Sequence, residues 1–162
     1  MLFEDTLCLA VGGAHPLAGQ RTRLSAQEFG QESLVVLNTS FALRRHIDEY
    51  CHEHGVAPHI AIETNSVSVI IEMIQVGRLA TVLPSSIVRT QCGLFPAKLS
   101  PELPNKAITV ITRKGGYKSP ACLAFTQLAT SWSAQRSEET PIRRMIPCPL
   151  SEEYYKNRTA NR

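Results

Sequence analysis

Residues 14–38 constrain the fold of this chain more than any other stretch, because they join several distinct local signals in close succession. Before them, residues 6–11 form a mostly apolar run that ends at two glycines, as expected of a buried strand. The dipeptide His15-Pro16 then prevents both a continued helix and a central strand, since proline lacks an amide hydrogen and restricts the residue before it. The chain therefore turns at this point.

A short helix is predicted after the turn. Ser25 and Glu28 have the spacing of a capping box, in which a hydroxyl and a carboxylate satisfy free amide groups at the start of a helix. Gly30 ends this helix, and residues 33–37 resume an apolar run. The segment thus predicts a turn, a short helix and a second strand.

Apolar runs rich in Val, Ile and Leu recur along the chain and are mostly separated by helical patterns. Because helices that cross between parallel strands cover the faces of the sheet, this alternation predicts an α/β fold with a mainly parallel sheet flanked by helices. The runs are residues 33–37, 59–63, 79–83 and 107–112.

Apolar residues at helical spacing predict three longer helices. The first two end at Gly55 and Gly77, and the third runs from Ser119 to about Ser133. Each has one apolar stripe, which predicts an amphipathic helix that packs on a core. The residues of the three stripes are Leu43, Ile47, Tyr50 and Cys51, then Val67, Ile70, Ile71 and Ile74, and finally Ala121, Phe125, Leu128 and Trp132.

Two stretches lack a clear pattern. Residues 92–106 contain three prolines and predict an irregular connection that follows a short helix over residues 84–89. Residues 135–162 combine mixed charges with few scattered apolar residues, and we expect a mobile tail there.

Three junctions between a strand and the following helix carry short polar side chains, namely residues 38–40, 64–66 and 84–86. In a parallel sheet with right-handed crossovers, ligands gather outside the carboxyl ends of the strands, where helices present free amide groups and positive dipole ends. Each junction alone is explained by helix capping, because Ser, Thr and Asn are preferred capping residues. Their convergence on one edge, with Gly12 allowing close backbone approach, favours a pocket for a small anion or polar ligand.

Catalytic and metal-binding motifs receive little support. G-x-S-x-G, a P-loop and G-x-G-x-x-G are absent from the sequence. Glu63 could act as an acid or base, but a solvated or cap-bonded carboxylate is favoured, and His15 is expected to bond backbone. Cys51, His52 and His54 suggest a metal site, yet two histidines two residues apart on a helix cannot share a face. We therefore expect no catalytic residue, no metal and no cofactor.

Composition excludes several function classes. The formal net charge of +3 comes without a dense stripe of Lys and Arg, so direct DNA binding is not expected. The first 13 residues are acidic where a signal peptide is basic, and no apolar run approaches the roughly 20 residues of a membrane span, which indicates a cytoplasmic protein. Five scattered cysteines without a C-x-x-C pair are expected to be reduced and mostly buried.

Three phrases, in this order, resemble the effector-binding domain of LysR-type transcriptional regulators. They are AHPLAG at 14–19, ALRRHIDEYCHEHGVAPHI at 42–60 and ETNSVSVIIEMIQVGRLATVLP at 63–84. The resemblance covers residues 2–132. It is closest to members of the family that regulate cyanate-degradation operons, through LVVLNTSFALRRHIDEYC, IETNSVSVIIEMI and TVLPSSI.

This resemblance implies a periplasmic-binding-protein-like fold of type 2, in which the effector lies between two α/β lobes. It implies a small anionic effector such as cyanate, and a homo-oligomer in which the helix at 42–54 can serve an antiparallel dimer. DNA contacts would be made only through an N-terminal helix-turn-helix that has no counterpart in these residues. Carried over by position, the ligand-binding residues are Gly12, Thr39, Ser40, Asn65 and Ser66.

The family pattern also implies a division of the chain. Residues 1–16 would be a strand of a partial lobe one, residues 17–109 a complete lobe two, residues 110–133 the return strand and helix to lobe one, and residues 134–162 a tail. One departure concerns Leu79, which stands where the family usually has a second glycine and implies a smaller pocket.

Two other function classes stay open at this point. One is a small α/β enzyme that uses Glu63 or His15. The other is a solute-binding protein of a transporter, which the lack of a signal peptide disfavours.

Overall fold

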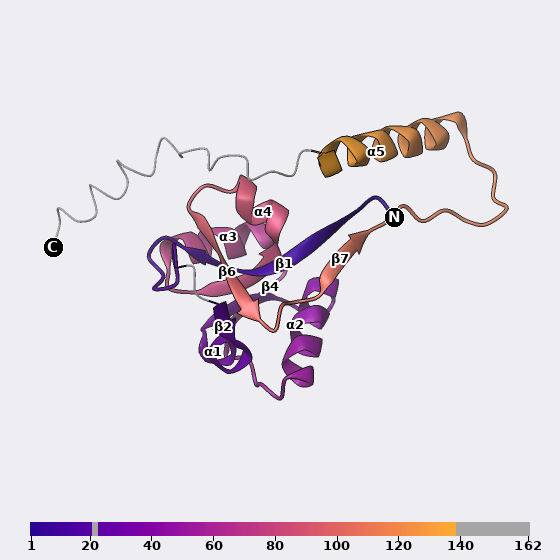
Figure 1. Ribbon diagram of the computed structural model, residues 1–162. Helices are drawn as coiled ribbons and strands as arrows, with labels where there is room; N and C mark the ends of the chain where they lie inside the picture. The colour runs from indigo at the N-terminus through magenta and orange to yellow at the C-terminus, as the bar shows by residue number, and fades with distance from the viewer. Residues whose placement is uncertain (21–22, 139–162) are drawn as a thin grey trace. The chain divides into compact units, whose positions relative to one another are not determined.

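The computed structural model describes residues 1–20 and 23–138 (Figure 1). These residues form two compact units, the larger made of residues 6–104 and the smaller of residues 1–5 and 105–138. The division differs from the predicted boundaries at residues 16 and 109. It falls earlier at both places, because most of the first strand pairs within the larger unit.

The larger unit is built on a mixed sheet. Its strand order is β2-β6-β1-β5-β3-β4, with β1 antiparallel to both of its neighbours β5 and β6 and the other pairs parallel. The predicted α/β class is confirmed, but the sheet is less parallel than expected because β1 runs against β5. The strands are β1 Phe3–Gly12, β2 Arg23–Ser25, β3 Leu34–Leu37, β4 Ile60–Thr64, β5 Ala80–Pro84 and β6 Leu94–Ser100.

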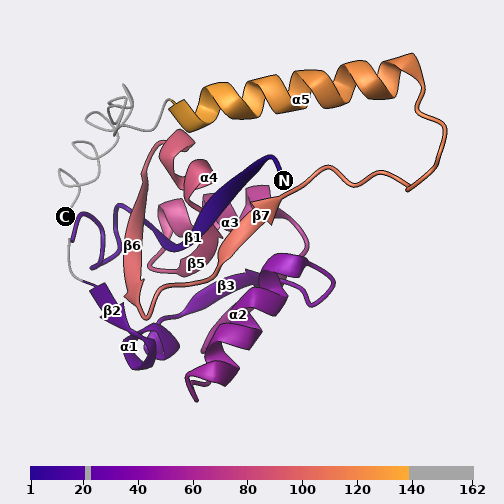
Figure 2. The ribbon, with the colours of Figure 1, turned by 45° about the vertical axis from the view of Figure 1, so that its right-hand side comes forward.

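Helices cover both faces of this sheet, as Figure 2 shows. Alternate residues of β3 point to opposite faces, so Leu34 and Val36 join one core and Val35 and Leu37 the other. The first core contains residues of α1 (Ala26–Gln31) and α2 (Ala42–Glu53), and the second contains residues of α3 (Val67–Val76) and α4 (Ser85–Thr90). Apolar burial on two sides thus explains why β3 is fully buried.

The predicted capping box at the start of α1 is confirmed. The Ser25 hydroxyl accepts the Glu28 amide hydrogen at 3.2 Å, and the Glu28 carboxylate accepts the Ser25 amide hydrogen at 2.7 Å. Hydrogen bonds from the Ser25 backbone and side chain lower the pKa of the exposed Glu28 carboxyl. The local sequence therefore determines where this helix begins.

The prediction of an irregular connection over residues 92–106 is wrong for residues 94–100 and 105–106, which lie in strands, and holds for residues 101–104. Residues 94–100 form β6, in which Leu94, Ala97 and Leu99 are buried at near-alternating positions. Pro96 lies opposite Ala10 of β1, within the strand itself. Strand β6 pairs with β1 on one side and with β2 on the other. This pairing keeps Pro96 in a strand, although proline is unfavourable inside a sheet.

The smaller unit pairs β7 (Asn105–Ile108) with the start of β1 and contains α5 (Pro120–Glu138). The strand predicted over residues 107–112 is thus observed at residues 105–108, so it is shorter than predicted and starts two residues earlier. The helix is confirmed but continues beyond Ser133, so residues 134–138 belong to it and not to a tail. The remainder of the predicted tail lies outside the described residues.

Gly12 ends β1 where the C-terminal half of α3 crosses it. A β-carbon built on Gly12 would lie 1.9 Å from the Ile74 carbonyl oxygen and 2.9 Å from the α-carbon of Gln75. Both neighbours are backbone atoms, which a side-chain rotation cannot move away. Gly12 is therefore required for α3 to approach the sheet closely.

We predict that Gly12→Ala lowers the free energy of unfolding by at least about 3 kcal/mol, because the strand or the helix must shift. Gly55→Ala serves as the control. Its φ of +62° strains an alanine, but no atom lies within 4 Å of the added β-carbon, so a loss of only about 1 kcal/mol is expected. Urea unfolding of the two variants measures the difference, and equal losses would contradict the close approach.

Candidate functional site

The three polar junctions predicted from the sequence meet at one edge of the larger sheet. Leu37 of β3 lies opposite Thr64 of β4 in parallel register, and Leu34 of β3 lies opposite Ala80 at the start of β5. The strands β3, β4 and β5 therefore end at the same edge. We call this edge, with residues 38–40, 64–66 and 84–86, the carboxyl edge.

The loop after β3 is held by its own polar groups. The Asn38 side-chain oxygen accepts hydrogen bonds from the Ser40 amide, at 3.1 Å, and from the Ser40 hydroxyl. The Asn38 amide donates to the Thr64 carbonyl at 2.9 Å and so ties this loop to the next strand. Thr39 and Ser40 are both exposed at the tip of the loop.

The loop after β4 combines one capping residue with one available amide. The Ser66 hydroxyl accepts the Val69 amide hydrogen at 3.4 Å and caps α3, while the Ser66 amide donates to the Thr64 hydroxyl at 3.3 Å. Asn65 between them is exposed, and its side chain has no hydrogen-bond partner among the described residues. Ser66 is thus engaged in the structure, whereas Asn65 is available to a ligand.

The start of α2 differs from that of α3. Its N-cap residue is Phe41, which has no side chain able to accept a hydrogen bond, and no side-chain cap is present. The first amide groups of this 12-residue helix point out of its N-terminus beside Thr39 and Ser40. Free amide groups and the positive end of the helix dipole favour a negatively charged group at this position.

Thr6 also belongs to the carboxyl edge, and the sequence did not indicate it. Because β1 is antiparallel to β5, Leu7 lies opposite Pro84, and the Thr6 hydroxyl lies 3.4 Å from the Ser85 hydroxyl. The direction of β1 relative to β5 was the missing information. A hydroxyl from a fourth strand therefore joins the three junctions.

The structure does not bring Gly12 to this edge. Val11, just before it, lies opposite Ala80, the first residue of β5, so Gly12 is at the amino end of the parallel strands. The predicted set of five therefore separates into Thr39, Ser40, Asn65 and Ser66 at one edge and Gly12 at the other. Packing against α3 accounts for this glycine.

Arg44 of α2 connects the elements that carry the carboxyl edge. Its side chain, 11% exposed, donates to Asp48 at 2.9 Å, to Glu63 at 2.6 Å and to the Leu37 carbonyl at 3.3 Å. Burial alone disfavours its charge, but the hydrogen bonds to Asp48 and Glu63 outweigh this effect and raise the pKa of Arg44 above its usual value. Arg44 therefore joins α2 to the ends of β3 and β4.

The other candidate residues have structural partners. Glu63 is bonded to Arg44, and the buried His15 ring accepts the Leu17 amide hydrogen at Nδ1 and contacts Glu32 at 3.2 Å through Nε2. The prediction that His15 bonds backbone is confirmed. Residues 1–20 and 23–138 contain no group of three His, Cys, Asp or Glu that could hold a metal.

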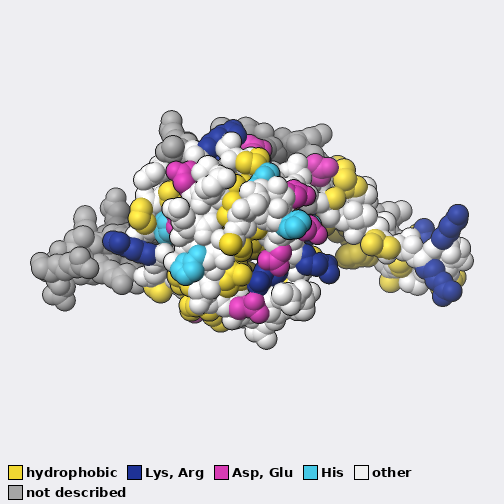
Figure 3. Space-filling model, turned by 90° about the horizontal axis from the view of Figure 1, so that it is seen from below, with side chains coloured by type: hydrophobic (Ala, Val, Ile, Leu, Met, Phe, Trp, Pro, Cys, Tyr) yellow, Lys and Arg dark blue, Asp and Glu magenta, His cyan; other side chains and the backbone are white. Residues whose placement is uncertain are grey.

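The surface over α1 and α2 carries mixed charges. Figure 3 shows acidic, basic and histidine side chains interspersed on this face, without a cluster of Lys and Arg. Within the described part of the chain, no helix is both long and apolar enough to cross a membrane.

A cavity of about 230 Å³ lies in the smaller unit and contains none of the predicted site residues. Both polar and apolar side chains line it, among them Lys118, Leu123 and Thr126. The hydroxyls of Thr126 and Thr130 that border it already donate to carbonyls of α5. The carboxyl edge therefore has more polar groups available to a ligand than this cavity has.

Comparison with known proteins identifies the family. Residues 1–134 match the sequence profile of the LysR substrate binding domain. A hydrogen peroxide-inducible genes activator of Dickeya chrysanthemi is 27% identical over 133 residues, and a probable activator of the same kind from Mycobacterium avium is 27% identical over 118. The matched segments cover 80% and 69% of this chain but only 42% and 37% of the two relatives.

Solved structures show the same fold. The regulatory domain of CcmR from Synechocystis PCC6803, in complex with 2-PG, has a TM-score of 0.69 at 16% identity. The effector binding domain of QuiR, in complex with shikimate, has a TM-score of 0.68 at 21% identity. The reduced form of OxyR has a TM-score of 0.63 at 23% identity. The matches cover 82%, 83% and 86% of this chain and 64%, 64% and 65% of those chains.

We predict that Arg44→Met destabilises the protein by about 1–2 kcal/mol, a modest value because Asp48 and Glu63 are nearly half exposed. The neighbouring Arg45→Met removes the same charge from an exposed position and should change stability by less than about 0.5 kcal/mol. Thermal or urea unfolding compares the two. A larger loss for Arg45→Met would contradict the role assigned to Arg44.

Proposed function

The chain belongs to the LysR substrate-binding domain family, and we propose that it senses a small effector at the carboxyl edge and thereby controls transcription. The observation that carries the proposal is the convergence of Thr39, Ser40 and Asn65 with the uncapped start of α2. A side-chain amide, hydroxyls and free backbone amides together form a site for a small polar molecule. Two structural relatives are described with small molecules bound, 2-PG and shikimate.

A small anion fits this edge best. The N-terminus of α2 offers hydrogen-bond donors that no side chain occupies, and no carboxylate caps it. The two acidic side chains of the Arg44 network, Asp48 and Glu63, are both paired with Arg44. The local field therefore favours a negatively charged ligand over a cation.

Cyanate is the specific effector that we propose. The resemblance of residues 34–51 and 62–74 to regulators of cyanate-degradation operons supports this choice, and these residues include two of the three junctions of the carboxyl edge, 38–40 and 64–66. A short linear anion also suits a site built from loop tips and one helix N-terminus. Larger anions such as shikimate provide the comparison that tests this size limit.

The link to transcription extends to parts of a regulator beyond these residues. The chain spans less than half the length of the two relatives, so contacts with DNA and the oligomer that makes them belong to the proposal. A ligand can change DNA contacts only if it binds one arrangement of the regulator more tightly than another. We propose that effector binding at the carboxyl edge supplies this difference.

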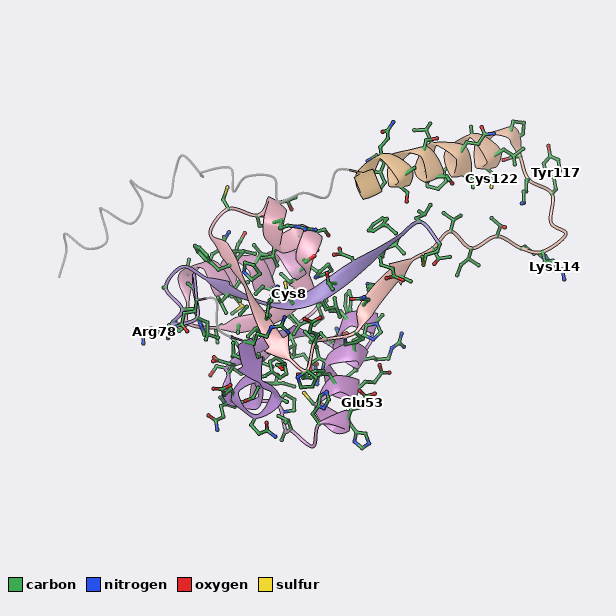
Figure 4. The ribbon with its side chains drawn as sticks, viewed as in Figure 1. Cys8, Glu53, Arg78, Lys114, Tyr117 and Cys122 are labelled. Carbon is green, nitrogen blue, oxygen red and sulfur yellow. The ribbon has the colours of Figure 1, made fainter. Side chains whose placement is uncertain are left out.

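Peroxide sensing is the second candidate function, because the two relatives are named as hydrogen peroxide-inducible activators. Reaction with peroxide requires an accessible thiolate. Cys51 is buried, and burial raises the pKa of its thiol. Cys8 on β1 and Cys122 on α5 (Figure 4) are partly buried, and Cys92 is exposed. The expectation of mostly buried cysteines is thus wrong for Cys92.

We predict that cyanate binds the chain in isothermal titration and that Asn65→Ala weakens binding by about 10- to 100-fold, the cost of one hydrogen bond to a charged group. Asn105→Ala, which removes an exposed asparagine in the smaller unit, should leave the affinity unchanged. Equal affinities of both variants would remove Asn65 from the site. Binding of shikimate but not cyanate would overturn the proposed effector.

We predict that Cys51 reacts with hydrogen peroxide at least about tenfold more slowly than the exposed Cys92, because its thiol is buried and protonated. Mass spectrometry of the folded chain after timed peroxide exposure measures both rates. Fast oxidation of Cys51 at low peroxide concentration would instead support peroxide sensing.

A further inference from the structure

The face of α5 that borders the rest of the smaller unit differs from the apolar stripe that the sequence predicts. Phe125 and Leu128 of that stripe are 66% and 72% exposed. Thr126 and Thr130 instead line the cavity of about 230 Å³ in this unit, which we call the α5 cavity. Two threonines fill less space than the large apolar side chains that usually pack a helix on its neighbours, so a cavity remains.

Contacts of Leu2 and Phe3 fix the elements around the α5 cavity. The Leu2 amide donates to the Ile108 carbonyl at 2.7 Å, and the Leu2 carbonyl accepts the Ser133 hydroxyl. The Phe3 ring packs edge-on against Trp132, with ring centroids 5.8 Å apart. The start of the chain, the end of β7 and α5 are thus connected, and the cavity is formed before any ligand arrives.

The walls of the α5 cavity are largely apolar. The hydroxyls of Thr126 and Thr130 each donate to a backbone carbonyl one turn earlier in α5, at 2.8 Å. A hydroxyl that is bonded in this way offers no hydrogen to a ligand, and the methyl group of the same side chain adds apolar surface. Leu2, Val110 and Leu123 line the cavity as well. A ligand with an apolar body therefore fits these walls better than a polar one.

Lys118 supplies the charge of the α5 cavity. Among the described residues that line the cavity, it alone has a charged side chain. It is exposed and has no hydrogen bond or ion pair with another described residue. The lysine ammonium group has three donor hydrogens and no acceptor, so it favours a carboxylate as its partner. A single cation beside apolar walls selects a ligand with one negative charge and an apolar body.

The volume of the α5 cavity limits the size of this body. A cavity of about 150 Å³ lined by apolar side chains holds benzene, which has six heavy atoms. In proportion, 230 Å³ holds about nine heavy atoms, which equals a six-membered carbon ring with one carboxylate. Leu123 is 47% exposed, so the cavity is open to solvent on this side and a ligand can enter.

We propose that the α5 cavity is a second ligand site, which binds a monocarboxylic acid with a compact apolar body of about nine heavy atoms. The carboxylate pairs with Lys118, and the body contacts Leu2, Leu123 and the threonine methyl groups. Cyanate has no such body and is not a ligand of this site. The α5 cavity lies within the smaller unit, and the proposal does not depend on an effector at the carboxyl edge.

Titration of the isotope-labelled full chain with cyclohexanecarboxylate, followed by NMR of the amide resonances, tests the proposal. We expect saturable shifts at Lys118, Leu123 and Thr126, with a dissociation constant below about 1 mM. Cyclohexanecarboxamide has the same shape without the charge and should bind at least about tenfold more weakly. Acetate has the charge without the body and should cause no saturable shift at these residues.

Substitutions separate the charge from the apolar wall. Lys118→Met should weaken binding of cyclohexanecarboxylate at least about tenfold, and Leu123→Ala should weaken it about threefold to tenfold. The controls are Lys114→Met, which removes an exposed lysine of the preceding turn (Figure 4), and Leu128→Ala, which shortens an exposed leucine outside the cavity. Both controls should leave the affinity within about twofold. Circular dichroism checks that each variant keeps its helical content.

Four outcomes would overturn the proposal. No saturable shift with cyclohexanecarboxylate excludes the site. Shifts at Asn65 without shifts at Leu123 place the acid at the carboxyl edge. Equal affinities for the acid and its carboxamide remove the role of Lys118. An equal loss in Lys114→Met and Lys118→Met shows a general effect of charge and no specific pairing.

Discussion

The position of β1 at the centre of the larger sheet determines what the rest of the structure can do. It pairs antiparallel with β5 on one side and β6 on the other, and its buried residues Leu9, Ala10 and Val11 contribute to both cores. This pairing places Thr6 at the carboxyl edge and Gly12 at the opposite edge. It also provides the partner that keeps Pro96 within a strand.

The carboxyl edge combines a rigid base with available tips. Arg44 connects α2 to the end of β3 and to Glu63, and the Asn38 amide connects the loop after β3 to the end of β4. Above these contacts, Thr39 and Asn65 remain exposed and the amides of α2 have no side-chain cap. Groups that are fixed in place before a ligand arrives bind it with a smaller entropic cost, which is why this edge suits a sensor.

Local signals in the sequence predicted much of this arrangement. The Ser25–Glu28 capping box, the helix cap at Ser66 and the three polar junctions depend on residues a few positions apart, and the structure confirms them. The errors concern contacts between distant residues. Pairing of β1 with β5 decides the place of Gly12 and Thr6, and pairing of β6 with β1 overrides a proline, neither of which a local pattern contains.

The central claim is that a small anion binds at the carboxyl edge, and the backbone amides there report it directly. Titration of the isotope-labelled chain with cyanate, followed by NMR of the amide resonances, distinguishes the two edges and the cavity of the smaller unit. Our account predicts that the largest shifts occur at Ala42, Leu43 and Asn65, with no change at Gly12. Shifts confined to Gly12, or to Lys118 and Leu123 around the cavity, would contradict it.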